Sequence, residues 1–225
     1  MDPPRDTIHA LEYTYHLLGD IRHKTVLDLG CGTGENSTML AYRGANVIGL
    51  DISSELIEIA QRRAQVQGQT VQFVVTSAYA TGLPGGSIDV VFGQAILHHL
   101  DLDTAATEIR RILRPGGYAV FVEPVRDSAT LRFLRRLIPY KHSGISPFEY
   151  PLTRRQIRNF AIGYTLQGVR RYYLPLTRVA QLIGWERFPL KVDRWMLQTA
   201  PWTGHFAAVE VFCMVSHTGE SSAAR

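Results

Sequence analysis

The sequence predicts an α/β fold: a doubly wound, mainly parallel sheet of seven strands with helices on both faces. Through the first 124 residues, short apolar runs rich in β-branched residues alternate with segments of helical periodicity, which is typical of βαβ units. Each strand-like run is almost continuously apolar, as expected where helices cover both faces of a parallel sheet. Two further strand-like runs near the end of the chain complete the predicted sheet.

The element boundaries follow from apolar runs, capping residues and turn residues. The predicted strands are Thr25–Leu29, Asn46–Leu50, Val71–Val75, Ile88–Phe92, Tyr118–Val122, Leu166–Tyr173 and Ala207–Val215. The predicted helices between the first five strands are Glu35–Tyr42, Ser53–Val66 and Thr104–Leu113. Ser53 and Ser54 suit the N-cap of the second helix, and Pro115-Gly116-Gly117 ends the third.

Four apolar residues before the first strand recur at helical spacing: Ile8, Leu11, Tyr15 and Leu18. They predict an N-terminal helix that lies against the sheet or over its binding edge.

The composition excludes several classes of protein. With 45% hydrophobic residues, the 225-residue chain can bury a continuous core. Its two cysteines, Cys31 and Cys213, form no metal-ligand or redox pair, and we expect no metal site. Segment Met1–Ala10 lacks the basic start and apolar run of a secretory signal. No stretch reaches the roughly 18 uncharged apolar residues of a spanning helix, so we expect a cytoplasmic protein.

Positive charge is unevenly distributed along the chain. The net charge is +4, and residues 126–171 hold ten Lys and Arg against two acidic residues. This asymmetry indicates an anionic partner or a membrane surface near that segment, or else a solvated basic face.

The strongest local signal is the run Val26-Leu27-Asp28-Leu29-Gly30-Cys31-Gly32-Thr33-Gly34, a strand that breaks into three alternate glycines before a helix. Glycine allows positive φ and has no Cβ to block a ligand beside the backbone. In a doubly wound sheet, the carboxyl end of this strand is the usual ligand crevice.

The acidic residues favour one kind of ligand over another. A dinucleotide fingerprint reads G-x-G-x-x-G, whereas this loop reads G-x-G-x-G and follows an acid, Asp28, which suits an ammonium group better than a phosphate. Asp51 ends the second strand, where a carboxylate accepts hydrogen bonds from both ribose hydroxyls. A glycine turn and an acidic helix cap in an unrelated α/β protein is the alternative interpretation.

From Thr25 to Pro124 the sequence resembles the class I S-adenosylmethionine-dependent methyltransferases, and more narrowly the small-molecule group similar to ubiquinone and menaquinone biosynthesis enzymes. The motifs that carry the resemblance are VLDLGCGTG, GLD, LPGGSIDVVF, ILHHL and LRPGG. The resemblance implies the Rossmann-like methyltransferase fold and the cofactor S-adenosyl-L-methionine. It implies that Asp28 and the backbone of Gly30 to Gly34, including Gly32, surround the methionine part, that Asp51 holds the ribose and that Ile52 packs on adenine.

One departure from the family pattern affects the adenine site. The family commonly has an acid after the third strand, where this chain reads Val75-Thr76-Ser77-Ala78-Tyr79. We expect Ser77 to accept a hydrogen bond, the Ala78 backbone to contact adenine and Tyr79 to stack on it. Ser77 as an ordinary turn residue is the alternative.

Two further residues near the cofactor have separate roles. Gln94, at the end of the fourth strand, is expected to contact the cofactor. Cys31 lies among the glycines and is interpreted as a packing residue of the cofactor loop rather than a nucleophile.

Methyl transfer from a sulfonium requires alignment and exclusion of water, and a general base only for acceptors such as a hydroxyl or an acidic carbon. The predicted base lies in Leu97-His98-His99-Leu100, just beyond the fourth strand. The resemblance favours His99 as the catalytic residue. Alternatively, His99 orients a loop without proton transfer. Glu123 ends the fifth strand and also faces the crevice by position.

The acceptor is expected to be a small molecule or lipid-like compound, with an anionic one as an alternative, and nucleic acid is disfavoured because no additional binding module is evident. We expect a single domain over residues 1–225, with residues 1–24 as a helical lid and residues 125–165 and 174–205 as acceptor-side insertions. Within the first insertion, Leu131–Ile138 with Arg132, Arg135 and Arg136 predicts either a peripheral membrane contact or a lid packed on the domain.

Two functions of other classes remain open at this point: a nicotinamide-dependent oxidoreductase and a catalytically silent cofactor-binding or scaffold subunit.

Overall fold

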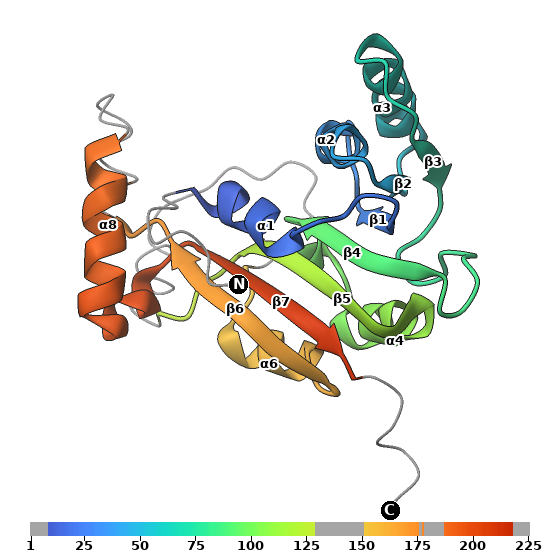
Figure 1. The fold of residues 1–225 in the computed structure, drawn as a ribbon. Helices are drawn as coiled ribbons and strands as arrows, with labels where there is room; N and C mark the ends of the chain where they lie inside the picture. Colours follow the sequence, from blue (N-terminus) through green and yellow to red (C-terminus); the bar gives the residue numbers. More distant parts are fainter. Residues whose placement is uncertain (1–8, 129–150, 176, 178–186, 218–225) are drawn as a thin grey trace, which may run out of the picture.

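The computed structural model describes residues 9–128, 151–175, 177 and 187–217. Its centre is a seven-stranded sheet in the order β3-β2-β1-β4-β5-β7-β6 (Figure 1). The strands are β1 (Thr25–Leu29), β2 (Asn46–Asp51), β3 (Gln72–Val75), β4 (Ile88–Gln94), β5 (Leu113–Pro124), β6 (Tyr164–Tyr172) and β7 (Val209–Ser216). β7 is antiparallel to β5 and β6, and the other neighbouring strands are parallel. The predicted fold class is confirmed.

Helices cover both faces of this sheet (Figure 1). They are α1 (Ala10–Leu18), α2 (Glu35–Tyr42), α3 (Ser54–Val66), α4 (Leu102–Ile112), α6 (Arg154–Phe160) and α8 (Arg187–Thr199), with short 3₁₀ helices η1 (Leu97–His99) and η2 (Pro201–Phe206). α1, α2 and α3 lie on one face, and α4 and α6 lie on the other. Within the described part of the chain, no helix is both long and apolar enough to cross a bilayer.

The hydrophobic core lies on both faces of the sheet, in separate clusters of buried residues. On the face of α4 and α6, Phe121 packs edge-on against Phe160 with ring centroids 5.7 Å apart, and both side chains are buried. On the opposite face, Leu18 and Leu40 pack with Phe92 in a second buried cluster. Full burial of such a side chain stabilises the fold by about 1.5–3 kcal/mol. These contacts fix the strand ends on which the candidate site is built.

Local capping sets where the helices begin. The Ser53 hydroxyl accepts the N–H of Leu56 at 3.2 Å, which confirms Ser53 as the cap of α3. The start predicted for the next helix, Thr104, is wrong by two residues, because the Asp101 carboxylate accepts the Thr104 N–H at 2.9 Å and caps a helix that begins at Leu102. A side-chain oxygen at an N-cap satisfies one of the free N–H groups of the first turn.

The N-terminal helix lies against the sheet, as predicted. The Tyr13 hydroxyl donates to the carbonyl of Gly168 at 2.8 Å, and the Tyr118 hydroxyl donates to the carbonyl of Leu18 at 2.5 Å. These two bonds join α1 to β6 and β5. The role of residues 1–24 as a lid stays a prediction.

The two predicted acceptor-side insertions are described only in part. The Leu131–Ile138 segment lies outside the described residues. In the later part of the first insertion, α6 buries Ile157 and Phe160 in the core, so this helix supports the sheet. In the second insertion, the buried Asp193 of α8 accepts the N–H of Leu174 at 2.8 Å, which joins α8 to the chain that follows β6.

Candidate functional site

The loop after β1 contains three glycines with left-handed backbone angles: φ is +70° at Gly30, +52° at Gly32 and +76° at Gly34. A Cβ on Gly30 would lie 2.4 Å from the Cδ1 atom of Ile96. A Cβ on Gly34 would lie 2.7 Å from the Cβ atom of Ala60. Nothing lies within 4 Å of a Cβ placed on Gly32. Packing therefore requires glycine at the outer two positions, while the backbone of Gly32 is open to a ligand.

Asp51, at the end of β2, holds this loop in place. Its Oδ2 atom accepts the N–H of Gly32 at 2.9 Å, and its Oδ1 atom accepts the N–H of Ser53 at 3.0 Å. The next residue, Ile52, is an apolar side chain with 77% of its surface exposed. The Asp51 carboxylate and the exposed Ile52 side chain thus lie next to the open space at Gly32. This arrangement is compatible with the ribose contact predicted for Asp51 and the adenine contact predicted for Ile52.

Asp28 lies in β1 just before the loop and Cys31 lies within the loop, and both are buried. The Ser37 hydroxyl donates to the Asp28 carboxylate at 2.5 Å. Burial raises the pKa of Asp28 to about 7, against the lowering effect of the Ser37 hydrogen bond. Because Asp28 is only 1% exposed, its predicted contact with the methionine ammonium stays a prediction. Burial also raises the pKa of the Cys31 thiol, consistent with a packing residue rather than a nucleophile.

The turn after β3 is internally hydrogen-bonded. The Ser77 hydroxyl accepts the N–H of Tyr79 at 3.2 Å, and a β-bridge joins Ser77 to Ala80. The Tyr79 hydroxyl accepts the N–H of Asp101 at 2.9 Å, while 37% of the Tyr79 residue surface is exposed. The adenine contacts predicted for Ser77, Ala78 and Tyr79 stay predictions, and their turn lies at the same edge of the sheet as Asp51.

Gln94 ends β4 and is joined to both neighbouring helices. The Tyr15 hydroxyl of α1 donates to Asn36 Oδ1 of α2 at 2.8 Å, and Asn36 Nδ2 donates to Gln94 Oε1 at 2.8 Å. The Gln94 amide is thus linked to α2 directly and to α1 through Asn36. Its role in cofactor contact stays a prediction.

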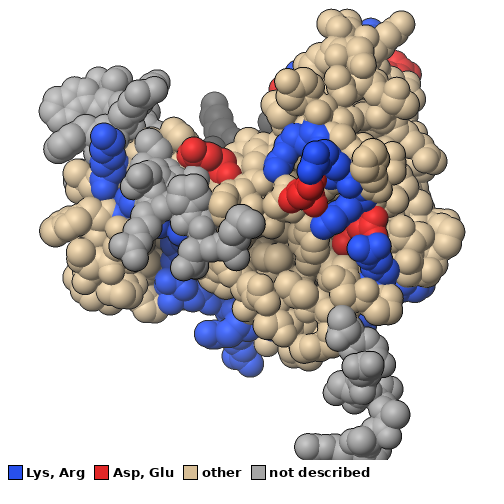
Figure 2. Space-filling view, in the orientation of Figure 1, with Lys and Arg blue, Asp and Glu red and all other residues tan. Residues whose placement is uncertain are grey.

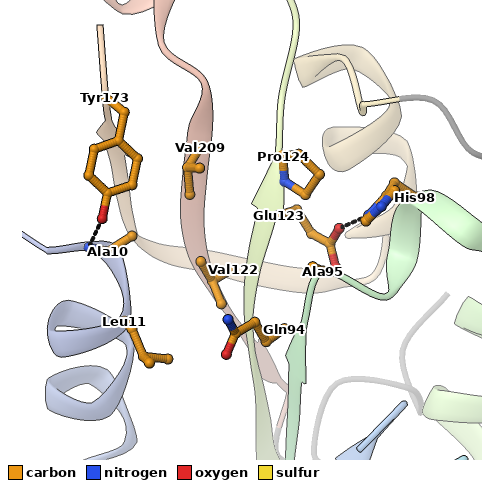
Figure 3. A pocket seen from close by; sticks show the side chains of 10 residues that line it. All are labelled: Ala10, Leu11, Gln94, Ala95, His98, Val122, Glu123, Pro124, Tyr173 and Val209. Carbon is orange, nitrogen blue, oxygen red and sulfur yellow. Dashed lines mark hydrogen bonds and ion pairs between the residues drawn. The ribbon is translucent and has the colours of Figure 1, made fainter. Parts of the chain in front are cut away.

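The most elaborate hydrogen-bond arrangement surrounds Glu123, whose side chain is fully buried. Its Oε1 atom accepts the N–H groups of Ile96 and Leu97, both at 2.8 Å. Its Oε2 atom lies 2.9 Å from Nδ1 of His98 (Figure 3). The turn between β4 and η1 therefore wraps around a buried carboxylate, with Ala95 at a positive φ of +53°.

A cavity of about 350 Å³ opens beside this arrangement, at the carboxyl ends of β4 and β5 (Figure 3). Its apolar lining residues are Ala10, Leu11, Ala95, Val122, Pro124 and Val209. Its polar lining residues are Gln94, His98, Glu123 and Tyr173. No Lys or Arg is among these described lining residues.

The two histidines of the predicted base motif have different positions. His98 lines the cavity and contacts Glu123, whereas His99 is not among the described lining residues and packs against His98 with ring centroids 4.0 Å apart. The structure thus brings His98 to the cavity, and catalysis by His99 stays a prediction.

Sequence reasoning did not single out Tyr173 as a site residue. It follows directly after β6, and its hydroxyl accepts the N–H of Ala10 at 3.2 Å (Figure 3). The available signal was its place at the end of the predicted strand Leu166–Tyr173, because parallel strands present their carboxyl ends at the same edge of a sheet as Gln94 and Glu123.

A doubly wound sheet with one reversed strand, a glycine loop after β1 and an acid at the end of β2 together define the class I S-adenosylmethionine-dependent methyltransferases. Comparison with known proteins leads to the same class. The family model described as a methyltransferase domain matches residues 27–121.

The chain is 32% identical over 183 residues to a ubiquinone biosynthesis O-methyltransferase of Nitrosomonas europaea, a match that covers 76% of this chain and 77% of that relative. It is 38% identical over 105 residues to a demethylmenaquinone methyltransferase of Thermus thermophilus, a match that covers 44% of this chain and 47% of that relative's length. Among solved structures, magnesium protoporphyrin IX methyltransferase from Synechocystis with bound SAH superposes with a TM-score of 0.61 at 17% identity, over 94% of this chain and 82% of that one.

The chain therefore belongs to the S-adenosylmethionine-dependent methyltransferase family, in the group that resembles quinone biosynthesis enzymes, and S-adenosylmethionine is its cofactor. The match with the Thermus relative spans less than half of that protein's length.

Proposed function

We propose that this chain methylates a hydroxyl or an acidic carbon of a compact, largely apolar and uncharged acceptor, bound in the cavity beside His98. The observation that carries the proposal is the buried Glu123 carboxylate, which holds His98 at the cavity wall with two backbone N–H groups as its other partners. Such an arrangement suits proton transfer, which thiolate and free-amine acceptors do not need.

The contact with Glu123 sets which ring nitrogen of His98 carries a hydrogen. A carboxylate only accepts hydrogen bonds, so the ring nitrogen 2.9 Å from it, Nδ1, carries the proton in this assignment of the network. The neutral ring then keeps a lone pair on Nε2. When Nε2 takes the acceptor's proton, the adjacent carboxylate stabilises the resulting imidazolium, as in other His-carboxylate pairs.

S-adenosylmethionine, when bound, supplies the electrophilic methyl group. The chain's own residues align the acceptor, remove the acceptor's proton and exclude water. The apolar walls formed by Leu11, Val122 and Val209 favour an acceptor with a large hydrocarbon surface. The name of the Nitrosomonas relative, an O-methyltransferase of ubiquinone biosynthesis, supports a hydroxyl as the acceptor group.

The distribution of charge supports an uncharged acceptor. Within the basic segment, Arg154 pairs with Asp127, and Arg171 pairs with the buried Glu210, so these two arginines are directed to internal partners. On the face shown in Figure 2, Lys and Arg side chains occur in separate groups, and one of these groups has acidic side chains among it. A continuous basic surface, which nucleic-acid binding favours, is not seen over the described residues of this face. An anionic acceptor, a peripheral membrane contact through residues 131–138 and a cytoplasmic location remain as secondary proposals.

Labelled methyl transfer tests the proposal. The chain is incubated with methyl-labelled S-adenosylmethionine and either a small-molecule extract or 2-naphthol as a defined probe, and products are identified by mass spectrometry. We expect label on an oxygen or acidic carbon, and His98→Ala should lower turnover by about 10²–10⁴-fold with unchanged S-adenosylhomocysteine affinity.

His99→Ala is the matched control, because His99 is the ring neighbour of His98 outside the described lining of the cavity. We expect it to retain most of the turnover. Loss of turnover in His99→Ala alone would instead support the original prediction for His99, and cofactor binding without any labelled product would support a catalytically silent subunit.

A further inference from the structure

Tyr173 has a backbone conformation that its residue type disfavours. Its φ is +63°, and among the described residues only His23 and Ala95 are other non-glycine residues with positive φ. This backbone region is strained for an L-residue other than glycine, and such strain persists where the surrounding structure imposes it, often at binding sites. Two of these three residues, Ala95 and Tyr173, line the same cavity.

The neighbours of Tyr173 hold this conformation from both sides. Its carbonyl accepts the N–H of Ala208 at 3.0 Å, next to the start of β7. The following N–H, of Leu174, donates at 2.8 Å to Asp193, a buried carboxylate of α8. The ring is therefore placed by β7 and α8 together, and it extends towards α1 at the cavity (Figure 3).

The Tyr173 hydroxyl has a defined polarity. It accepts the N–H of Ala10, the first residue of α1, at 3.2 Å. Helix N-termini have free N–H groups, and the N-cap residue His9 provides no side-chain cap for this one. Since the oxygen acts as the acceptor, the hydroxyl proton is available to donate, and no hydrogen bond within the described part of the chain uses it.

Tyr173 and His98 therefore offer opposite polarities to a ligand. In Figure 3, Tyr173 lies on the α1 side of the cavity and His98 on the other side, with Val122 and Val209 between them. His98, whose Nε2 is the ring nitrogen not bonded to Glu123, can accept a proton at one end of the cavity, and the Tyr173 hydroxyl can donate a hydrogen bond at the other.

We infer that Tyr173 determines acceptor specificity by donating a hydrogen bond to a second oxygen of the acceptor, at the end remote from the group that is methylated. The inference rests on the proposed function. The acceptor class is then an apolar molecule with a reacting hydroxyl at one end and a carbonyl oxygen towards the other.

A pair of probes tests this inference by isothermal titration against the full chain saturated with S-adenosylhomocysteine. 2-Naphthol has the hydroxyl alone, and 6-acetyl-2-naphthol adds a carbonyl at the far end. We expect the acetyl compound to bind the wild type roughly threefold to tenfold more tightly, the range for one net hydrogen bond. Tyr173→Phe keeps the ring and removes the hydroxyl, so it should bring the affinity ratio close to one.

Tyr13→Phe is the matched control. It removes another tyrosine hydroxyl that tethers α1, through the 2.8 Å bond to Gly168, but Tyr13 is not among the described lining residues of the cavity. It should leave the ratio unchanged. An unchanged ratio in Tyr173→Phe overturns the inference, and so does an equal loss in both variants, which would indicate loosening of α1.

The probes also separate this inference from the function on which it rests. Methylation of 2-naphthol together with a wild-type affinity ratio of one would overturn the specificity role of Tyr173 alone. Failure of both probes to bind the wild-type chain would overturn the proposed acceptor class and this inference with it.

Discussion

Replacing Glu123 by Gln should abolish the proton transfer that we propose while leaving the fold intact. The amide oxygen of Gln accepts the N–H groups of Ile96 and Leu97 as the carboxylate does, at positions now 2.8 Å from Oε1. In the reverse orientation, the NH₂ group of Gln would face the N–H groups of Ile96 and Leu97, and this contact between donors is unfavourable. The NH₂ group must therefore face His98, where it donates to Nδ1 and moves the ring proton to Nε2.

The expected effect on turnover is large and the effect on stability small. With the proton on Nε2, that nitrogen has no lone pair to accept the acceptor's proton, so turnover with a hydroxyl acceptor should fall by about 10²–10⁴-fold. The upper value of about 10⁴ is that of the same carboxylate-to-amide change in the Ser-His-Asp triad. Glu123→Ala, in contrast, leaves the buried N–H of Leu97 and the part-buried N–H of Ile96 without a partner, so it should lower the free energy of unfolding by at least about 1–3 kcal/mol, the cost of one unsatisfied buried group.

Three measurements check this reasoning: turnover with labelled cofactor, S-adenosylhomocysteine affinity by titration, and unfolding in urea. Glu123→Gln should show this fall in turnover, bind cofactor normally and unfold near the wild-type midpoint. Normal turnover in this variant would refute the role of Glu123 in orienting the base, whereas a loss of stability equal to that of Glu123→Ala would refute the assigned amide orientation.

Three further predictions concern the cofactor loop. Asp51→Ala should weaken S-adenosylhomocysteine binding by about 1.5–3 kcal/mol, the range for hydrogen bonds to a charged group, and unchanged affinity by titration in a folded variant would remove Asp51 from the site. In Gly30→Ala, the residue keeps a φ of +70° and its new Cβ would lie 2.4 Å from Cδ1 of Ile96. We expect this variant to lose about 2–4 kcal/mol of unfolding free energy, measured in urea, and Gly32→Ala to lose about 1–2 kcal/mol. Equal losses would contradict the packing role of Gly30. Burial raises the pKa of Asp28 to about 7, so the folded chain binds the Asp28 proton more tightly than the unfolded chain does. The contribution of Asp28 to the free energy of unfolding is therefore greatest below about pH 4 and falls as the pH rises towards 7. Asp28→Asn should flatten this dependence of stability on pH, and an unchanged dependence would exclude Asp28 as its source.

Much of the sheet could be predicted from sequence because its central strands are buried on both faces. β1 and α2 have the predicted bounds, and β2 and β4 differ only at their carboxyl ends. The start of α4 could not be placed from apolar periodicity, because Asp101 caps it through a local side-chain contact. The position of Asp51 and Gly32 was predictable for a simpler reason: both follow directly from where parallel strands end.

The choice between the two adjacent histidines could not be predicted in the same way. Their motif forms a 3₁₀ turn, and the contact that orients His98 comes from Glu123, a residue on another strand. Sequence adjacency carries no information about that contact. The burial of Asp28 is similar, because Ser37 from α2 covers a carboxylate that the sequence places at the edge of a ligand crevice.

The reversed strand explains how one cavity combines apolar walls with polar ends. Gln94, Glu123 and Tyr173 lie at or just beyond the carboxyl ends of three strands that run in the same direction. β7 lies between β5 and β6 in the opposite direction, so its first residue, Val209, pairs with Pro124 on one side and Tyr172 on the other. The amino end of β7 therefore lies between the carboxyl ends of β5 and β6, and the apolar side chain of Val209 separates Glu123 from Tyr173. The sheet order consequently sets the spacing between His98 and Tyr173, the two residues that we propose contact the acceptor's oxygens. We therefore expect this chain to distinguish acceptors by the spacing of their two oxygens.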